Sequence, residues 1–163
     1  MSDDMVRAIG VNGGVIQINF GSGFVTKEAQ LWNVDQRAAV ANYAADHDLS
    51  SNDPEVVEFR RSFRIRNPFP YATTSDVVDH IDRVVSLIGI DHVGLGSDYD
   101  GVGDTLPEGL KDVSSYPNLV AELQSRSYSG PEIEKILGGN VMRVWREVEL
   151  YAMARGNLPK CRI

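Results

Sequence analysis

The pattern of apolar positions predicts two short strands in this chain. One is the run 15–20, Val-Ile-Gln-Ile-Asn-Phe, and the other begins at His92 and continues through the apolar residues that follow. Such runs are typical of strands buried on both faces of a parallel sheet. Small residues end both runs, at Gly21-Ser22-Gly23 and at Gly96-Ser97. The strands therefore end where a ligand could approach the backbone.

Apolar residues spaced three and four positions apart predict helices around these strands. Ser, Thr and Asp precede most of these segments as cap residues, and Gly ends several of them. The helix that follows Thr26 has an apolar stripe of Leu31, Val34, Ala38, Ala41 and Ala45. Together the expected helices cover residues 2 to about 13, 26 to about 46, 76 to about 88 with Ser75 as the cap, 116–126, 129–137 and 141 to about 155.

Residues 27–73 differ from the regular alternation of strand and helix. Within them, the segment ending at Pro54 is a turn or a helix start, and Asn67-Pro68-Phe69-Pro70 forces extended backbone. We interpret 27–73 as a variable helical excursion and loop inside one unit that covers 1–163. The order of the elements indicates an α/β fold, either a β/α barrel or a doubly wound sheet. Two strands alone would leave open edges.

Composition and charge exclude several classes of protein. The 163 residues are 42% hydrophobic, enough for one globular domain, and the net charge of -7 argues against nucleic-acid binding. Cys161 is the only cysteine, so neither an internal disulfide nor a cysteine-based zinc site is possible. The start of the chain does not resemble a secretory signal, and no window is apolar enough to span a bilayer, which favours a cytoplasmic location.

The candidate chemistry lies at the end of the second strand, where Ser97-Asp98-Tyr99-Asp100-Gly101 follows the apolar run. Active sites of parallel α/β proteins lie at the carboxyl ends of strands, so Asp98 is the leading catalytic candidate. From the residues alone, Asp98 could equally form a turn, and turn formation with Gly101 is the favoured interpretation of Asp100. A calcium loop of the EF-hand type is disfavoured because Gly109 stands where that loop requires Glu.

Three histidines are available as metal ligands, but their contexts favour other interpretations. His47 lies between two aspartates at a polar helix end, and His80 lies between two aspartates within a helix. His92 stands at the start of the second strand, at the end away from the candidate chemistry. A hydrolytic zinc site needs about three protein ligands for each metal. We therefore expect no metal ligand in this chain.

Several motifs in the same order closely resemble the membrane dipeptidase (renal dipeptidase) family of zinc metallopeptidases. They are Gly13 to Phe20, Asp79-His80-Ile81-Asp82, Gly89 to Gly101, Pro107 to Leu110, Asp112-Val113-Ser114, Tyr116 to Leu119 and Gly138 to Val144. The resemblance implies a (β/α)8 TIM-type barrel, two zinc ions and hydrolysis of dipeptides. This chain matches only the last two strands of that barrel and their helices.

The resemblance also implies roles for individual residues. Asp98 falls on the aspartate that handles protons and the substrate amine, and it is the expected catalytic residue. Substrate-binding residues are expected at the two strand ends: Asn19, Phe20, Gly21, Phe24 and Ser97. The metal ligands of the family, and the arginine that grips the substrate carboxylate, would lie ahead of Ser2.

The chain is therefore interpreted as the carboxyl-terminal portion of a zinc dipeptidase, with Met1 close to an internal position of the barrel. We expect it to be inactive alone and not to bind the two zinc ions properly without the missing amino-terminal half of the barrel. The alternative is a non-catalytic remnant or half-barrel interaction module that assembles with a partner chain. A homo-oligomer is compatible with both interpretations.

Overall fold

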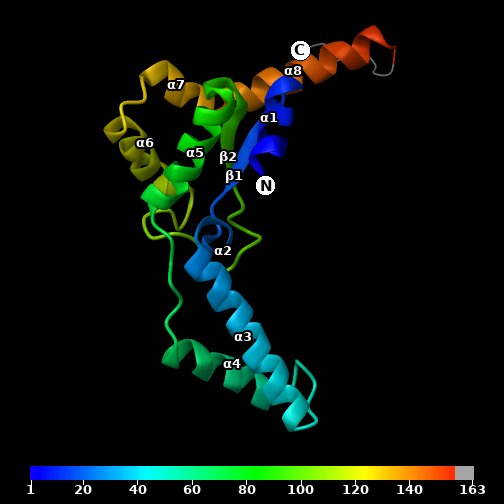
Figure 1. Ribbon diagram of the computed structural model, residues 1–163, viewed down its shortest axis with the longest axis vertical. Coiled ribbons are helices and arrows are strands. Elements are labelled where there is room, and N and C mark those ends of the chain that lie inside the picture. The colour runs from blue at the N-terminus through cyan, green and yellow to red at the C-terminus, as the bar shows by residue number, and fades with distance from the viewer. Residues whose placement is uncertain (157–163) are drawn as a thin grey trace.

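The two predicted strands pair in parallel at the centre of the molecule. The computed structural model describes residues 1–156, in which β1 (Ile16–Asn19) and β2 (Val93–Ser97) form a two-stranded sheet. Ile16 lies opposite Val93 at the start of the register. The chain returns from β1 to β2 through α5 (Thr74–Ile88), which packs against both strands (Figure 1). The α/β class is confirmed as a helix-rich fold with a small parallel sheet.

The other helices follow the cap signals closely. They are α1 (Asp3–Val11), α2 (Ser22–Val25), α3 (Lys27–Asp46), α4 (Pro54–Arg66), α6 (Tyr116–Ser125), α7 (Gly130–Glu134) and α8 (Asn140–Ala154). The side chain of Ser2 accepts a hydrogen bond from the amide of Met5, as expected of an N-cap residue. The prediction of Ser75 as the cap of α5 was wrong, because Thr73 forms a capping box with Asp76. The short helix α2 was not expected.

The core lies between the sheet and the pair α5 and α6. Phe20, Ile81, Val93, Leu119 and Leu123 are fully buried there. The opposite face of the sheet is different. The prediction that both faces of the strands are buried was wrong, because Asn19 is exposed and Gln17 and Asn19 extend over glycines of β2. One face of the sheet is therefore packed with apolar side chains, and the other is polar and nearly free of side chains from β2.

Helices α3 and α4 form a hairpin that extends away from the sheet (Figure 1). Its inner contacts are aromatic, with Tyr43 stacked on Phe59 at 4.2 Å between ring centroids and Trp32 set edge-on against Phe63 at 5.7 Å. These contacts use a different face of α3 from the predicted apolar stripe. That stripe faces solvent, with Leu31 50% exposed. Aromatic packing against α4 thus decides the orientation of α3.

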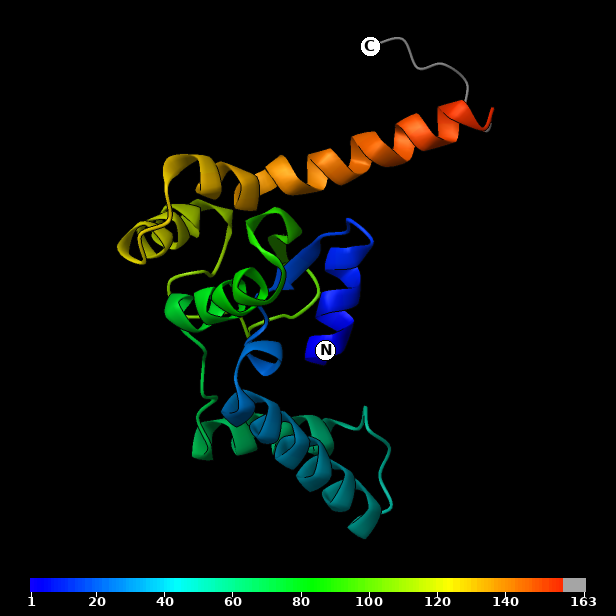
Figure 2. The same ribbon diagram turned by 45° about the horizontal axis from the view of Figure 1, so that its top comes forward.

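Helix α8 extends beyond the rest of the molecule, as Figure 2 shows. Trp145, Val148 and Tyr151 are each 61% exposed, and Leu150 is 65% exposed. A helix whose apolar side chains face solvent over several turns is unusual in a free monomer. No helix within residues 1–156 is both long enough and apolar enough to cross a membrane.

Candidate functional site

The carboxyl ends of β1 and β2 lie side by side and are joined by an irregular register. Ile18 pairs with Leu95, but Asn19 pairs with Ser97, so Gly96 is an extra residue in β2. The amide of Phe20 continues the pairing by donating to the Ser97 carbonyl at 3.0 Å. A bulge of this kind bends a strand and changes the direction of the side chains that follow. Here the residue that follows the bulged strand is Asp98.

The backbone at Ser97 and Asp98 is left-handed, with φ of 46° and 67°. Two consecutive non-glycine residues in this region are energetically costly, and such strain often occurs at functional sites. A backbone hydrogen bond from the Gly101 amide to the Asp98 carbonyl, at 3.2 Å, closes the turn that follows. The predicted turn at Asp100 and Gly101 is therefore present, and the backbone of Asp98 closes it.

Two glycines make room for the side chains at these strand ends. A Cβ atom at Gly101 would lie 2.2 Å from Asp98 Oδ1, and one at Gly96 would lie 2.7 Å from Asn19 Oδ1. Asn19 Nδ2 in turn donates to Asp98 Oδ2 at 3.4 Å. The Asp98 carboxylate is therefore positioned by the turn, by an amide from the neighbouring strand and by the absence of a side chain at Gly101.

The structure brings most of the sequence-predicted residues to one place. Asn19, Ser97 and Asp98 lie together at the strand ends, and Gly21 and Phe24 follow on the same side in and before α2. Phe24 is 66% exposed. Phe20 is different, because its side chain is fully buried and packs edge-on against Tyr99 and Tyr116. Phe20 supports the strand end from within the core.

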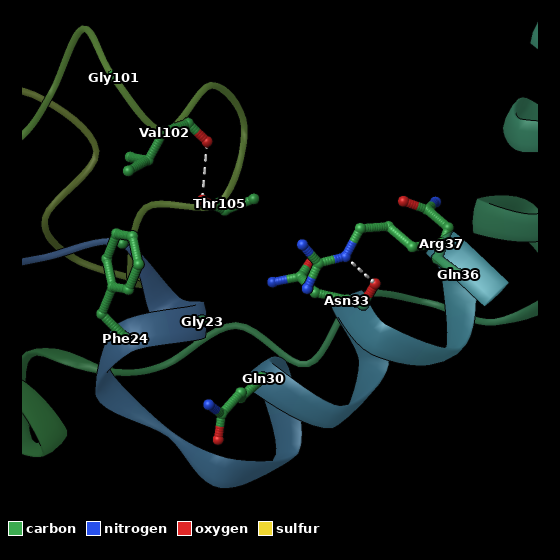
Figure 3. Close-up of a pocket in the computed structure, with 10 residues that line it drawn as sticks. Gly23, Phe24, Gln30, Asn33, Gln36, Arg37, Gly101, Val102 and Thr105 are labelled. Carbon is green, nitrogen blue, oxygen red and sulfur yellow. Dashed lines mark hydrogen bonds between the residues drawn. The ribbon is translucent and has the colours of Figure 1, made fainter. Parts of the chain in front are cut away.

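A cleft of about 480 Å³ begins beside these residues. It lies between α2, the first half of α3 and the loop that follows Asp100 (Figure 3). Ser22 of α2 is fully buried and connects the helix to two other segments, because its amide donates to the Thr105 carbonyl and its hydroxyl accepts from the Ala72 amide. The lining residues are Gly21, Gly23, Phe24, Gln30, Asn33, Gln36, Arg37, Gly101, Val102 and Thr105.

Tyr99, next to Asp98, has a buried hydroxyl without a hydrogen-bond partner among the described residues. Burial, together with the nearby Tyr116 and Asp112, raises the pKa of Tyr99 to about 12. The folded state therefore favours the neutral phenol. The stability that this difference provides is complete below the usual pKa of about 10 and is lost as the pH rises to about 12.

Replacing Tyr99 with Phe is expected to raise the free energy of unfolding at pH 7 by about 0.5 to 1 kcal/mol, because it removes an unpaired buried hydroxyl. Chemical denaturation at pH 7, 10 and 12 measures this effect. The wild-type chain should lose more stability than the variant between pH 10 and 12. Tyr151→Phe, at an exposed position, is the control. It should change neither the free energy of unfolding at pH 7 nor its decrease between pH 10 and 12. A destabilised Tyr99→Phe variant would contradict the interpretation.

The described residues do not fit a metal site. Within residues 1–156, no group of three or more His, Cys, Asp or Glu side chains is placed to hold an ion. Each histidine instead donates to a backbone carbonyl: His47 to Tyr43, His80 to Val25 and His92 to Gly14, at 2.7 to 2.8 Å. The structural interpretation of His92 is confirmed, since it joins the start of β2 to the loop before β1.

The fold and the strand-end site define the general class, an α/β protein whose polar residues gather at the carboxyl ends of parallel strands. Residues 1–157 match the family model described as membrane dipeptidase, peptidase family M19. The chain belongs to this family, which consists of metallodipeptidases. The family resemblance predicted from the sequence motifs is confirmed.

Individual relatives agree with this assignment. An uncharacterised dipeptidase of Schizosaccharomyces pombe is 32% identical over 93% of this chain and 27% of its own length. Dipeptidase 3 of Homo sapiens is 49% identical over 48% of this chain and 16% of its own length. The crystal structure of a probable dipeptidase, PvdM from Pseudomonas aeruginosa, superposes with a TM-score of 0.65 at 30% identity, covering 89% of this chain and 40% of that one. The chain thus spans less than half the length of these relatives.

Sequence reasoning missed the part of the cleft that α3 contributes. Gln30, Asn33 and Arg37 recur at helical spacing and lie on the face of α3 that lines the cleft. This polar periodicity is visible in the sequence, but it is equally typical of a solvated helix face. The buried hydrogen bonds of Ser22 could not be predicted either, because the sequence shows only a small residue between two glycines.

Proposed function

We propose that this chain forms one edge of an active site that hydrolyses dipeptides with the help of two zinc ions. The observation that carries the proposal is the position of Asp98, at a bulged and strained strand end beside an open cleft. Membership of a metallodipeptidase family supports the reaction class. Asn19, Gly21, Phe24 and Ser97 would shape the substrate pocket, with Phe20 behind them in the core.

In this proposal Asp98 moves a proton during hydrolysis. Its carboxylate accepts a proton from the water that attacks the peptide carbonyl carbon, and then gives a proton to the amine nitrogen as the C–N bond breaks. The same carboxylate can pair with the ammonium group of the substrate. The hydrogen bond from Asn19 holds the side chain in one orientation. The metal ligands would have to come from outside the described residues.

The open surfaces of the chain support a partial barrel. The two strands have no further neighbours within residues 1–156, and the apolar side chains of α8 face solvent. Further strands and helices of a (β/α)8 barrel would pack on both surfaces. The same two observations favour the second candidate, a non-catalytic half-barrel that assembles with a partner chain. The two candidates differ in whether that partner brings metal ligands.

The proposal predicts that the 163-residue chain with added zinc does not hydrolyse dipeptides, whereas a longer protein does. The test begins by reading the coding sequence upstream of the Met1 codon and expressing any in-frame extension. The longer protein should release free amino acids from a dipeptide panel, and a chelator should abolish that release. An extension that supplies His and acidic ligands but yields an inactive, folded protein would contradict the proposal. Activity of the short chain alone would contradict the fragment interpretation.

A further inference from the structure

Helix α3 carries an apolar stripe that the rest of residues 1–156 leaves exposed. Its members recur three and four positions apart along the helix: Leu31, Val34, Ala38, Ala41 and Ala45. The side chain of Leu31 is 50% exposed and that of Val34 is 48% exposed. A regular alternation of three and four is the spacing of a coiled-coil seam, along which two helices pack side by side. The stripe is therefore suited to packing against another helix.

The other side of α3 is already packed. Trp32 and Tyr43 contact α4 from the side of α3 that lies nearly opposite the stripe, and α3 also packs on α2. In Figure 1 and Figure 2 the hairpin of α3 and α4 projects from the body of the molecule. The stripe therefore faces outward on a projecting helix, where a second molecule can reach it.

The side chains of the stripe change in size along α3. Leu31 and Val34 lie in the first half, and Ala41 and Ala45 lie in the second half, with Ala38 between them. A second α3 in parallel orientation would set large side chains against large ones at one end and small against small at the other. In antiparallel orientation about Ala38, Leu31 lies opposite Ala45. Val34 then lies opposite Ala41, so large and small side chains interdigitate at a uniform distance between the helices.

The charges at the two ends of α3 also favour an antiparallel partner. Lys27 is the first residue of the helix and continues the stripe by one step, whereas Glu28 lies about a quarter of a turn away from it. Asp46 is the last residue, and Asp48 follows it. Antiparallel pairing brings Lys27 of each copy to the acidic end of the other, while parallel pairing would set like charges together. Opposed helix dipoles add to this preference.

The charged residues nearest the centre of the stripe are compatible with this pairing. Arg37 lies off the stripe and lines the cleft, and its Nε donates to the Asn33 carbonyl at 3.1 Å. Asp35 would lie opposite the uncharged Asn42 of the second copy. Neither charge enters the seam between the two helices.

We propose that two copies of this chain associate through their α3 helices, packed antiparallel with Ala38 near the two-fold axis. The same residues of both copies then form the contact, as in most symmetric dimers. One pair of helices buries less surface than a permanent dimer needs, so the dissociation constant should be about 10 to 100 µM. The inference goes beyond the proposed function, because it gives the excursion of residues 27–73 a role that does not depend on hydrolysis.

Cysteine cross-linking of the 163-residue chain tests both the contact and its direction. All variants carry Cys161→Ser, which removes the only native cysteine. Ala38→Cys should form a disulfide-linked dimer when diamide is added as the oxidant, at a protein concentration near the dissociation constant. Leu31→Cys and Ala45→Cys should each stay monomeric alone, but a mixture of the two should cross-link. Non-reducing gel electrophoresis measures the dimer, and mass spectrometry identifies the linked peptides.

Val57→Cys is the matched control for cross-linking. Val57 is 49% exposed, as Val34 is within one per cent, but it lies on α4. It should cross-link about tenfold more slowly than Ala38→Cys, because a disulfide requires the two Cβ atoms to lie about 4 Å apart.

Sedimentation equilibrium of chains without added cysteines gives an independent measurement. Ala38→Glu should weaken the association about tenfold or more, because it sets two carboxylates together at the centre of the seam. Val148→Glu changes an exposed residue of α8 in the same way and should leave the association unchanged. Circular dichroism checks that both variants keep their helices.

Several results would overturn the inference. If Ala38→Cys gave no more dimer than Val57→Cys, the stripe would not be a contact between copies. If Leu31→Cys cross-linked with itself, the helices would pair in parallel. If Ala38→Cys cross-linked to Val148→Cys, or if only Val148→Glu weakened the association, α8 of another copy would be the partner in place of α3.

Discussion

In the metal-loaded dipeptidase proposed above, replacing Asp98 with Asn is expected to lower kcat/KM for dipeptide hydrolysis about 10³-fold. The substitution removes the carboxylate that is proposed to accept the proton, and positioned acid-base groups typically contribute between about 10² and 10⁴. It should leave the fold intact, because Asn tolerates left-handed backbone and has the size of Asp. Steady-state kinetics measure the loss, and thermal unfolding checks that stability has not changed.

Asp100→Asn is the matched control for this experiment. Asp100 lies two residues away in the same turn, and its side chain is exposed. Its substitution removes the same charge and should change kcat/KM by about twofold or less. If Asp98→Asn kept more than a tenth of the wild-type activity, or if both variants lost activity equally, Asp98 would not be the residue that moves the proton.

The position of Asp98 could be predicted from the sequence because it depends on local features. An apolar run predicts a strand, the small residues after it predict the strand end, and a carboxylate at that place predicts chemistry. The bulge at Gly96 could not be predicted in this way. It depends on the register between two strands that are more than seventy residues apart, and it decides the direction of the Asp98 side chain.

The sequence did not predict which face of a helix or strand is buried, because that depends on the tertiary packing partner. In α3 the stripe that contains Leu31 has good helical spacing, but the aromatic side chains of Trp32 and Tyr43 pack against Phe63 and Phe59 of α4 instead. The same choice turns Arg37 toward the cleft. Phe20 was expected at the substrate, yet the alternation of the strand places it on the same face as Ile18, inside the core.

The link between α5 and α6 depends on Arg126, and replacing it with Met is expected to lower the free energy of unfolding by about 2 to 3 kcal/mol. The guanidinium binds Asp79 and Asp82 of α5, both at 2.6 Å, and Glu122 of α6 at 2.9 Å. Its side chain is 21% exposed. Removing the cation leaves three carboxylates close together, with only the hydrogen bond from the Tyr128 hydroxyl to Asp82 remaining, and this costs more than the loss of one ion pair. The value is discounted for solvent screening, because Asp79 is 67% exposed.

Arg83→Met provides the comparison, because Arg83 pairs with a single carboxylate, Asp3 of α1, and its side chain is 59% exposed. An exposed pair of this kind contributes about 1 kcal/mol or less. Urea unfolding of both variants at low salt and at about 1 M salt measures the difference. The loss in free energy of unfolding caused by Arg126→Met should be smaller at high salt. At about 1 M salt the screening length is only about 3 Å, so the three carboxylates repel one another less. If Arg126→Met lowered the free energy of unfolding no more than Arg83→Met does, apolar packing alone, through residues such as Leu119 and Leu123, would join α6 to α5.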